Sequence, residues 1–343
     1  MKLWVVLMGL CGMVSLAGAQ TAPPAGGQSS AVASAAAIAK AKPRDISPTT
    51  RPVGPLPKPD PAIERALVIS IDGLRPDVLL RADAPNIHKL YHSGAFSFWA
   101  YTTGFAITLP SHTSMLTGVT PTRHGIEWNR DLPLKTPIYP NVATLFQVAH
   151  RAGYTTAMAA GKSKFSTLNV PGSIDWVFIP STTKTDDGDV ARHAVAIIKA
   201  HKPQVMFIHF PQTDNAGHQY GWGTPEQLKA VAGADAALGQ VLAALDDEGL
   251  RASTFILLSA DHGGAGRGHG PEDPRSRHIP WIAVGPGIRK DFDLTRYPKL
   301  EIHTEDTFAT VCWLMGIPVP TRDLDGKPIK QILMEDELMH VAP

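Results

Sequence analysis

The sequence predicts an α/β fold in which helices cover both faces of a mostly parallel β-sheet. Short apolar runs alternate with segments of helical period through most of the 343 residues. Several of these runs are almost uninterrupted, which is typical of parallel strands that are buried on both faces. The hydrophobic share of 43% is enough to fill the core of one large domain of this kind.

The first 61 residues are predicted to lie outside that domain. Residues 1–19 have the pattern of a secretory signal peptide, because Lys2 precedes an apolar run that ends near small residues at Ala17 and Ala19. The run is shorter than the roughly 20 residues of a bilayer span, so we expect no stable membrane span after cleavage. Residues 20–61 are rich in Ala, Pro, Gly and Ser, which predicts a disordered linker. We therefore expect a periplasmic or secreted protein whose folded domain covers residues 62–343.

Within that domain, strands are predicted at residues 66–71, 155–159, 205–210, 254–259 and 280–284. Helices are predicted at residues 84–93, 141–152, 189–201, 225–248 and 304–315. Asn141 stands at the expected N-cap of its helix. Glycines stand where four of the helices should end: Gly94, Gly153, Gly249 and Gly316.

Charge and cysteine content argue against a protein that binds nucleic-acid polymers and against a domain held together by disulfides. The formal net charge is +1, so the chain lacks the basic excess of a protein that binds nucleic-acid polymers. One of the two cysteines, Cys11, lies inside the predicted signal peptide. Only Cys312 remains after cleavage, so the mature domain has no intramolecular disulfide and must depend on its core.

Acidic residues follow three of the predicted strands. Asp72 comes after the strand at residues 66–71, Asp214 follows the strand at 205–210 with His218 four residues later, and Asp261-His262 follow the strand at 254–259. An aspartate in such a position can also cap the next helix, and for Asp72 alone that alternative stays open. Three aspartates that converge at one sheet edge would repel one another without a cation. Carboxylate and imidazole together suit zinc or a similar divalent ion.

A run of hydroxyl residues supplies a candidate nucleophile. The stretch FAITLPSHTSMLTG, residues 105–118, includes Thr108 and Ser111, and we expect a helix to open after Pro110. A helix N-terminus presents free N–H groups and suits a phosphate or sulfate group. A hydroxyl placed there could attack phosphorus if a metal ion lowered its pKa. The alternative is that these hydroxyls only cap the helix.

Five motifs give the chain a specific resemblance. They are ISIDGLRPD from Ile69, TLPSHTSMLTGVTPTRHGIEWN from Thr108, DNAGHQYG from Asp214, SADHGGAGRGHG from Ser259 and IPWIAVGPGI from Ile279. With these stretches the chain resembles the alkaline phosphatase superfamily, in its type I phosphodiesterase/nucleotide pyrophosphatase branch. The resemblance implies an alkaline-phosphatase-like, three-layer α/β/α sandwich around a mostly parallel sheet.

The resemblance also implies a site with two divalent metal ions, which we expect to be zinc. One ion would be held by Asp72, Thr108, Asp261 and His262, and the other by Asp214, His218 and His269. His278 is the competitor of His269, whereas His303 is expected to be structural. Thr108 would be the catalytic nucleophile. Substrate contacts are expected from Ser111 and from Lys162, for which a solvated surface lysine is the alternative.

These residues imply an exported, metal-dependent phosphoric ester hydrolase that acts on small phosphate esters. A phosphomonoesterase or a sulfatase-like hydrolase of the same superfamily is the first alternative. A non-catalytic metal-binding envelope protein is the alternative from another class. The sequence does not choose between diesters and monoesters. Tyr220, Trp222 and Trp128 could wall a substrate pocket, with ordinary packing as the alternative.

Overall fold

The computed structural model describes residues 54–130, 138–181 and 185–334. The predicted signal peptide and residues 20–53 of the predicted linker lie outside the described residues. Residues 54–61 are described and lie on the domain: the Leu56 N–H donates to the Gly316 carbonyl at 2.6 Å, and Pro59 and Asp60 are buried. The folded domain was predicted to begin at residue 62. The residues from about 54 onward already pack on it.

One eight-stranded sheet forms the centre of the domain, with the strand order β4-β3-β5-β1-β6-β7-β2-β8. The strands are β1 (Arg65–Ile71), β2 (Ala95–Tyr101), β3 (Thr156–Ala160), β4 (Trp176–Phe178), β5 (Val205–Phe210), β6 (Thr254–Ser259), β7 (His278–Val284) and β8 (Phe292–Asp293). Strand β7 is antiparallel to both its neighbours, β6 and β2, whereas the other adjacent pairs are parallel. The sheet is therefore mostly parallel, as predicted.

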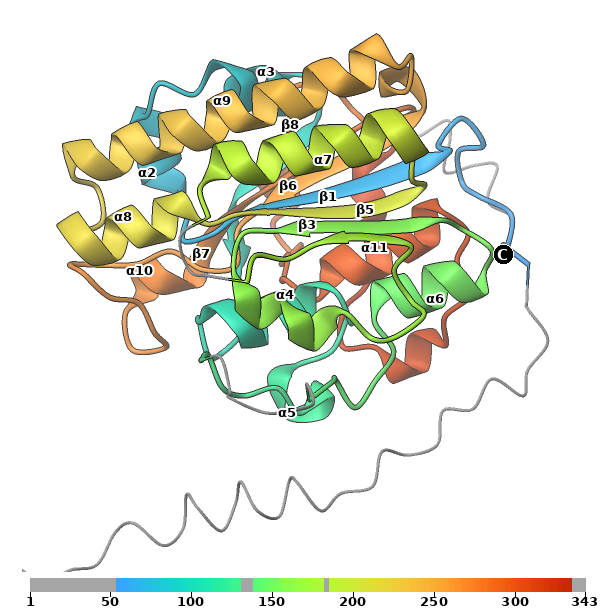
Figure 1. Ribbon diagram of the computed structural model, residues 1–343, viewed down its shortest axis with the longest axis horizontal. Helices are drawn as coiled ribbons and strands as arrows, with labels where there is room; N and C mark the ends of the chain where they lie inside the picture. The colour runs from blue at the N-terminus through green and yellow to red at the C-terminus, as the bar shows by residue number, and fades with distance from the viewer. Residues whose placement is uncertain (1–53, 131–137, 182–184, 335–343) are drawn as a thin grey trace, which may run out of the picture. The chain divides into compact units, whose positions relative to one another are not determined.

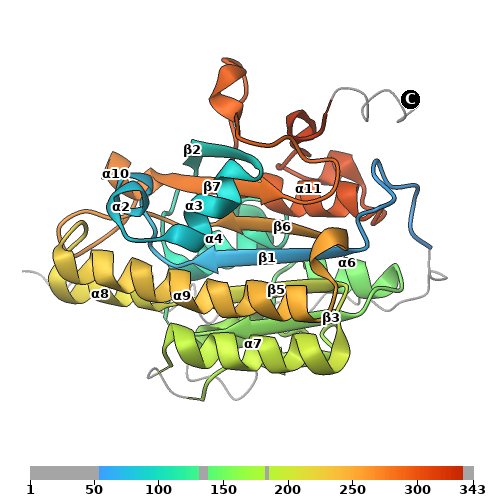
Figure 2. The ribbon, with the colours of Figure 1, turned by 90° about the horizontal axis from the view of Figure 1, so that it is seen from above.

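Helices cover both faces of this sheet, which confirms the predicted three-layer α/β/α architecture (Figures 1 and 2). On one face lie α3 (Pro85–His92), α7 (Asp187–His201) and α9 (Pro225–Asp247), and on the other α4 (Thr108–Met115), α6 (Leu145–Arg151) and α11 (Asp306–Leu314). The shorter α-helices are α2 (Pro76–Arg81), α5 (Pro121–His124), α8 (Gln212–Tyr220) and α10 (Pro274–Arg277). The 3₁₀ helices are η1 (Ser163–Leu168), η2 (Arg251–Ser253), η3 (Leu294–Arg296), η4 (Thr321–Asp323) and η5 (Lys330–Ile332).

The long helix α9 is apolar enough, by length and composition alone, to cross a membrane. Half of its most apolar stretch is buried inside the domain, however, and Val231, Leu238 and Leu245 are at most 3% exposed. The helix packs on α3, α7 and α8, so its apolar side chains belong to the interior of the domain.

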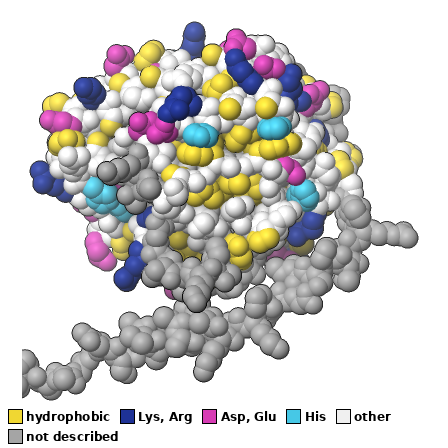
Figure 3. Space-filling view, viewed as in Figure 1, with side chains coloured by type: hydrophobic (Ala, Val, Ile, Leu, Met, Phe, Trp, Pro, Cys, Tyr) yellow, Lys and Arg dark blue, Asp and Glu magenta, His cyan; other side chains and the backbone are white. Residues whose placement is uncertain are grey.

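Strand β4 forms one edge of the sheet and carries aromatic side chains that pack on histidines of α7. Trp176 stacks on His201, with ring centroids 4.3 Å apart, and Phe178 stacks on His193 at 3.6 Å. Val177 between them is 44% exposed. Figure 3 views this side of the molecule and shows apolar side chains gathered beside histidines. Because the strand is only three residues long, it offers little backbone for pairing with another chain.

The five predicted strands and five predicted helices are all present, but some boundaries and three strands were missed. Helix α6 begins after Thr144, whose side chain forms a capping box with Gln147, so the predicted N-cap at Asn141 is wrong. Helix α4 begins at Thr108 and not after Pro110. The missed strands are β2, which carries Ser97 inside an aromatic run, and the very short β4 and β8.

Candidate functional site

Three adjacent strands at the centre of the sheet, β5, β1 and β6, run parallel. Their carboxyl ends lie side by side, and each leads into a segment with one of the predicted acidic ligands. Asp72 directly follows β1, Asp261 lies two residues after β6, and Asp214 lies in the first turn of α8, just after β5. All three are at most 2% exposed. The strand order thus brings together carboxylates that lie far apart in the sequence.

Each of these carboxylates has one oxygen bonded within the protein. Asp261 Oδ1 accepts the Gly73 N–H at 3.0 Å, and Asp72 Oδ2 and Asp214 Oδ2 each accept from Lys162 Nζ at 2.6 Å. The other three oxygens, Asp72 Oδ1, Asp214 Oδ1 and Asp261 Oδ2, are buried and have no hydrogen-bond partner among the described residues. A buried, unpaired carboxylate oxygen is costly unless a cation binds it.

The three histidines predicted as ligands present their Nε2 atoms to these free oxygens. In each ring Nδ1 donates to a backbone carbonyl: His262 to Gly263 (2.8 Å), His269 to Ala106 (2.9 Å) and His218 to Arg267 (3.0 Å). A neutral imidazole that donates from Nδ1 has an acceptor lone pair on Nε2. His218 Nε2 and His269 Nε2 lie 3.1 Å apart, so two lone pairs face one another. That arrangement suits two nitrogens that share a cation.

The ligand atoms form two overlapping groups that could each hold a metal ion: Asp214, His262 and His269, and Asp72, Asp261 and His262. In the first, Asp214 Oδ1 lies 3.7 Å from His269 Nε2, and the neighbouring His218 Nε2 lies 3.3 Å from the same oxygen. In the second, His262 Nε2 lies 3.2 Å from Asp261 Oδ2 and 3.5 Å from Asp72 Oδ1. Ligands bound tetrahedrally to one zinc at about 2.0–2.1 Å lie about 3.3 Å apart, so both groups fit such an ion.

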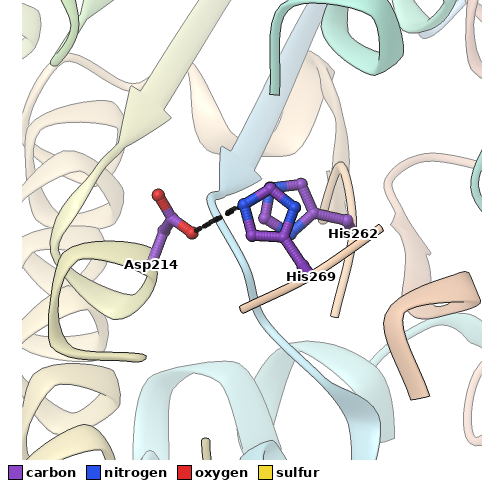
Figure 4. A group of neighbouring side chains, drawn as sticks. All are labelled: Asp214, His262 and His269. Atoms are coloured by element: carbon purple, nitrogen blue, oxygen red, sulfur yellow. Dashed lines mark ion pairs between the residues drawn. The ribbon is translucent and has the colours of Figure 1, made fainter. Parts of the chain in front are cut away.

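The rings of His262 and His269 stack directly, with centroids 3.6 Å apart and planes 15° apart. Figure 4 shows the two rings face to face, with Asp214 opposite them. The stack joins the two groups of ligands, because His262 lies closer to Asp261 and His269 belongs with Asp214.

Thr108 lies at the edge of the second group. It is the first residue of α4, is 1% exposed, and has its Oγ1 3.4 Å from His262 Nε2. The N-cap residue Ile107 provides no side-chain acceptor for the first turn of the helix. The next amide, Leu109 N–H, donates to Asn129 Oδ1 at 3.0 Å. The Thr108 hydroxyl therefore stands at the start of a helix and beside a predicted metal ligand, and the Asn129 side chain bonds the next amide of that helix.

The model of the type I phosphodiesterase/nucleotide pyrophosphatase family matches residues 66–267, which is more than half of the chain. The chain belongs to this family. It is 28% identical over 215 residues to the venom phosphodiesterase CdcPDE of Crotalus durissus collilineatus, a match that covers 57% of this chain and 26% of the venom protein. The chain thus spans about a quarter of the length of that curated relative.

Solved structures agree in fold. Murine ectonucleotide pyrophosphatase/phosphodiesterase 5, as an inactive variant in complex with AMP, superposes with a TM-score of 0.66 at 15% identity, over 79% of this chain and 100% of that one. A 2-O GAG sulfatase superposes with a TM-score of 0.64 at 18% identity, over 79% of this chain and 74% of that one. At such identities the likeness shows the alkaline-phosphatase-like fold.

Ser111, from which a substrate contact is predicted, has its hydroxyl bonded inside the protein. It is fully buried, and its Oγ donates to the Asp261 carbonyl at 2.7 Å and lies 2.6 Å from Thr102 Oγ1. The start of α4 at Thr108 places Ser111 at the end of the first helical turn, where its hydroxyl bonds within the protein. The contact to a phosphoryl oxygen stays a prediction.

Lys162 is not a surface lysine, since its side chain is only 17% exposed. Its ammonium lies between Asp72 and Asp214 and contacts Oδ2 of each. The Oδ1 atom of each carboxylate is the one without a hydrogen-bond partner among the described residues. Burial by itself would lower the pKa of this lysine, but the two carboxylates raise the pKa above its ordinary value. Lys162 therefore joins the two groups of ligands as a permanent cation and leaves their free oxygens in place.

The electrostatics of the remaining groups follow from burial and from this lysine. Burial would raise the pKa of Asp72, but Lys162 holds that pKa well below its ordinary value. Burial and the Asp72 charge raise the pKa of Asp261 well above its ordinary value. Burial, with a contribution from the adjacent His269, lowers the pKa of His262 to about 4. The imidazole of His262 is therefore neutral near pH 7, as a metal ligand must be.

Of the two histidines that competed for the last ligand position, only His269 lies beside the carboxylates. His278 is the first residue of β7, and its ring stacks on Trp99 with centroids 3.8 Å apart. His303 lies near Glu301 at 3.7 Å and stacks on Tyr101.

Two buried histidines and one asparagine near the site were missed by sequence reasoning. His209 Nε2 lies 2.8 Å from Asp72 Oδ2, and His112 Nδ1 lies 2.8 Å from the Thr108 carbonyl and 3.4 Å from Asp261 Oδ2. A histidine inside the otherwise apolar strand β5 was a usable signal for His209. Asn129 had no such signal, because only the fold brings it to the start of α4.

Proposed function

We propose that this protein is an exported hydrolase of phosphoric diester or phosphoanhydride bonds that uses Thr108 as its nucleophile and two divalent ions, most simply zinc. One observation carries the proposal: three unpaired carboxylate oxygens and three imidazole Nε2 atoms gather at the carboxyl edge of the sheet, with one buried threonine hydroxyl beside them. Membership of the phosphodiesterase family supports the same reaction.

The proposed ligand sets follow the distances. Asp72, Asp261, His262 and Thr108 would hold one ion, and Asp214, His218 and His269 the other. When bound, two such ions would lower the pKa of the threonine hydroxyl and stabilise negative charge on the attacking and leaving oxygens. The chemistry of the donors, oxygen and nitrogen in roughly equal number, suits zinc.

The protein's own groups would then bind and orient the ester. The Thr108 N–H at the start of α4 would donate to a phosphoryl oxygen, and Asn129 Oδ1, which accepts the Leu109 N–H, would hold the start of the helix in place. Thr108 Oγ1 would form a bond to phosphorus while the bond from phosphorus to the leaving oxygen breaks, which gives a phosphothreonine. Water would then break the Oγ1–phosphorus bond and restore the hydroxyl.

Lys162 changes the charge balance that the sequence implied. Three aspartates and a threonine alkoxide are balanced by two divalent ions, and the buried ammonium adds one positive charge. The loaded site would carry a net positive charge, which attracts an anionic ester. The substrate role predicted for Lys162 is therefore proposed as a through-space attraction, since its ammonium already contacts two carboxylates.

The predicted signal peptide supports a secreted or periplasmic location. The matched relative is a venom phosphodiesterase, and a second group of matches is named as ectonucleotide pyrophosphatases, which is compatible with secretion. A periplasmic location rests on the sequence of residues 1–19 alone.

The proposal is tested with the protein from residue 20 onward. Metal content is measured by elemental analysis, and turnover is compared on bis-p-nitrophenyl phosphate, p-nitrophenyl phosphate and p-nitrophenyl sulfate, with Thr108→Ala as control. We expect about two zinc ions per chain and diester turnover that is lost in the variant. Preference for the monoester or the sulfate would favour the first alternative. Two bound ions without turnover of any ester would favour the metal-binding envelope protein.

A further inference from the structure

Trp222 lies between α8 and α9, and its indole ring is surrounded by three glycines from three different segments. The ring Nε1–H donates to the Gly73 carbonyl at 2.9 Å. A Cβ atom on Gly217 would lie 2.7 Å from the ring, and one on Gly264 would lie 2.3 Å from it. Side-chain carbons do not approach that closely, so the ring requires glycine at both positions.

Each of these glycines adjoins a proposed metal ligand. Gly73 follows Asp72, Gly217 precedes His218, and Gly264 lies two residues after His262. The indole is thus the shared neighbour of segments that follow β1, β5 and β6. Because the indole is large and rigid and contacts all three segments, it sets the distances between them.

Trp222 also reaches the loop that carries the last ligand. Its backbone N–H donates to the Gly266 carbonyl at 2.8 Å, and its ring meets the His269 ring edge-on at 5.9 Å and the His218 ring at 5.3 Å, nearly perpendicular. The side chain is 8% exposed, and its one hydrogen-bond donor is used. It therefore offers a substrate neither an open face nor a donor, and its contacts all point to the protein.

We propose that Trp222 is a positioning residue that holds the ligand segments of both ion sites in register, so that its loss weakens metal binding more than it weakens the fold. The inference rests on the proposed function, because it assumes that these ligands bind divalent ions. Partners that orient metal ligands from behind typically change metal affinity by about 10–100-fold when they are removed. Trp222 contacts the rings of two such ligands, so its removal should lower zinc affinity by at least about 10-fold.

The test compares Trp222→Phe with Trp281→Phe. Trp281 is a matched control: it is fully buried, its Nε1–H donates to Thr307 Oγ1 at 3.2 Å, and it lies within β7, a strand that carries none of the proposed ligands. Zinc affinity is measured by competition with a chelator, at a temperature where circular dichroism shows both variants folded. We expect a loss of at least about 10-fold in zinc affinity for Trp222→Phe and less than about 2-fold for Trp281→Phe. Equal zinc affinities in the two variants would overturn the inference.

Gly217→Ala provides a second test that does not remove the ring. Alanine favours the helix at this position of α8, so by helix propensity alone the change should leave the fold intact or more stable. The added Cβ would nevertheless push on the indole, and we expect zinc affinity to fall. In a Trp222→Ala background the same change should have no further effect on zinc affinity. An additive loss in that background would contradict the role of the ring.

The outcomes also separate this inference from the proposed function. If the unmodified protein binds no zinc, the proposed function fails and the inference fails with it. If the unmodified protein binds two zinc ions and hydrolyses the diester, but Trp222→Phe and Gly217→Ala bind zinc as tightly, only the inference is wrong.

Discussion

Lys162→Met is the most informative single change, because it removes one charge from between the two proposed ion sites and leaves every ligand in place. The ammonium makes two ion pairs of 2.6 Å, with Asp72 and Asp214, and the side chain is 17% exposed. Removal of one partner from a buried ion pair costs about 3–5 kcal/mol, since the remaining charge is left uncompensated. In a domain of this size that corresponds to a decrease in Tm of about 6–10 °C.

The same deletion should have the opposite effect on metal binding. Without the ammonium, the site has a larger net negative charge, so divalent ions should bind more tightly and restore part of the lost stability. We therefore expect the Tm deficit of the variant to be large in the presence of a chelator and clearly smaller at saturating zinc. The measurement is thermal unfolding followed by circular dichroism under both conditions.

Lys199→Met is the matched control, because Lys199 also pairs with an aspartate, at 3.1 Å, but on the surface, with its side chain 47% exposed. Exposed pairs contribute about 0–1 kcal/mol, so this variant should unfold close to the unmodified protein with or without zinc. The reasoning is refuted if Lys162→Met shows the same deficit with zinc as with chelator, or if the two lysine variants unfold alike in chelator.

Three further predictions concern the nucleophile, the last ligand and a buried acid. Thr108→Ala should reduce diester turnover by about 10³-fold or more while zinc content stays near two per chain, and retained turnover would show that the nucleophile is misassigned. His269→Ala should remove about one zinc per chain and His278→Ala none, by elemental analysis; the reverse pattern would make His278 the ligand. Asp187 is 4% exposed, and burial raises its pKa to about 7, so its ionisation opposes folding and stability should fall as the pH rises from about 4 to 7. In urea unfolding, Asp187→Asn should remove this decrease and so raise the free energy of unfolding by a few kcal/mol at about pH 8, relative to the unmodified protein. An unchanged dependence of the free energy of unfolding on pH would contradict the prediction.

The sequence was a good guide to the centre of the sheet and to the residues at its carboxyl edge. Strands β1, β5 and β6 are short and mostly apolar, and an acidic residue follows each within four residues, so both the strands and their convergence could be inferred. Strand β2 was missed because its aromatic run is interrupted by Ser97, and its partner β7 runs antiparallel, far away in the sequence.

The parts of the site that were not predicted depend on the direction of side chains. The predicted start of α4 after Pro110 was three residues late, because the first helical turn already forms at Thr108. Lys162 looked like any lysine after a glycine, because its two partners come from β1 and α8. The sequence around Lys162 contains no signal of these contacts.

The face-to-face contact of His262 with His269 has a consequence for how the protein acquires its ions. Each ring is a ligand of a different proposed ion. If one ring tilts when its ion leaves, it must also move the stacked ring and so displace the Nε2 atom that binds the second ion. Occupancy of the two positions should consequently rise together during titration with zinc, and half-filled molecules should be scarce.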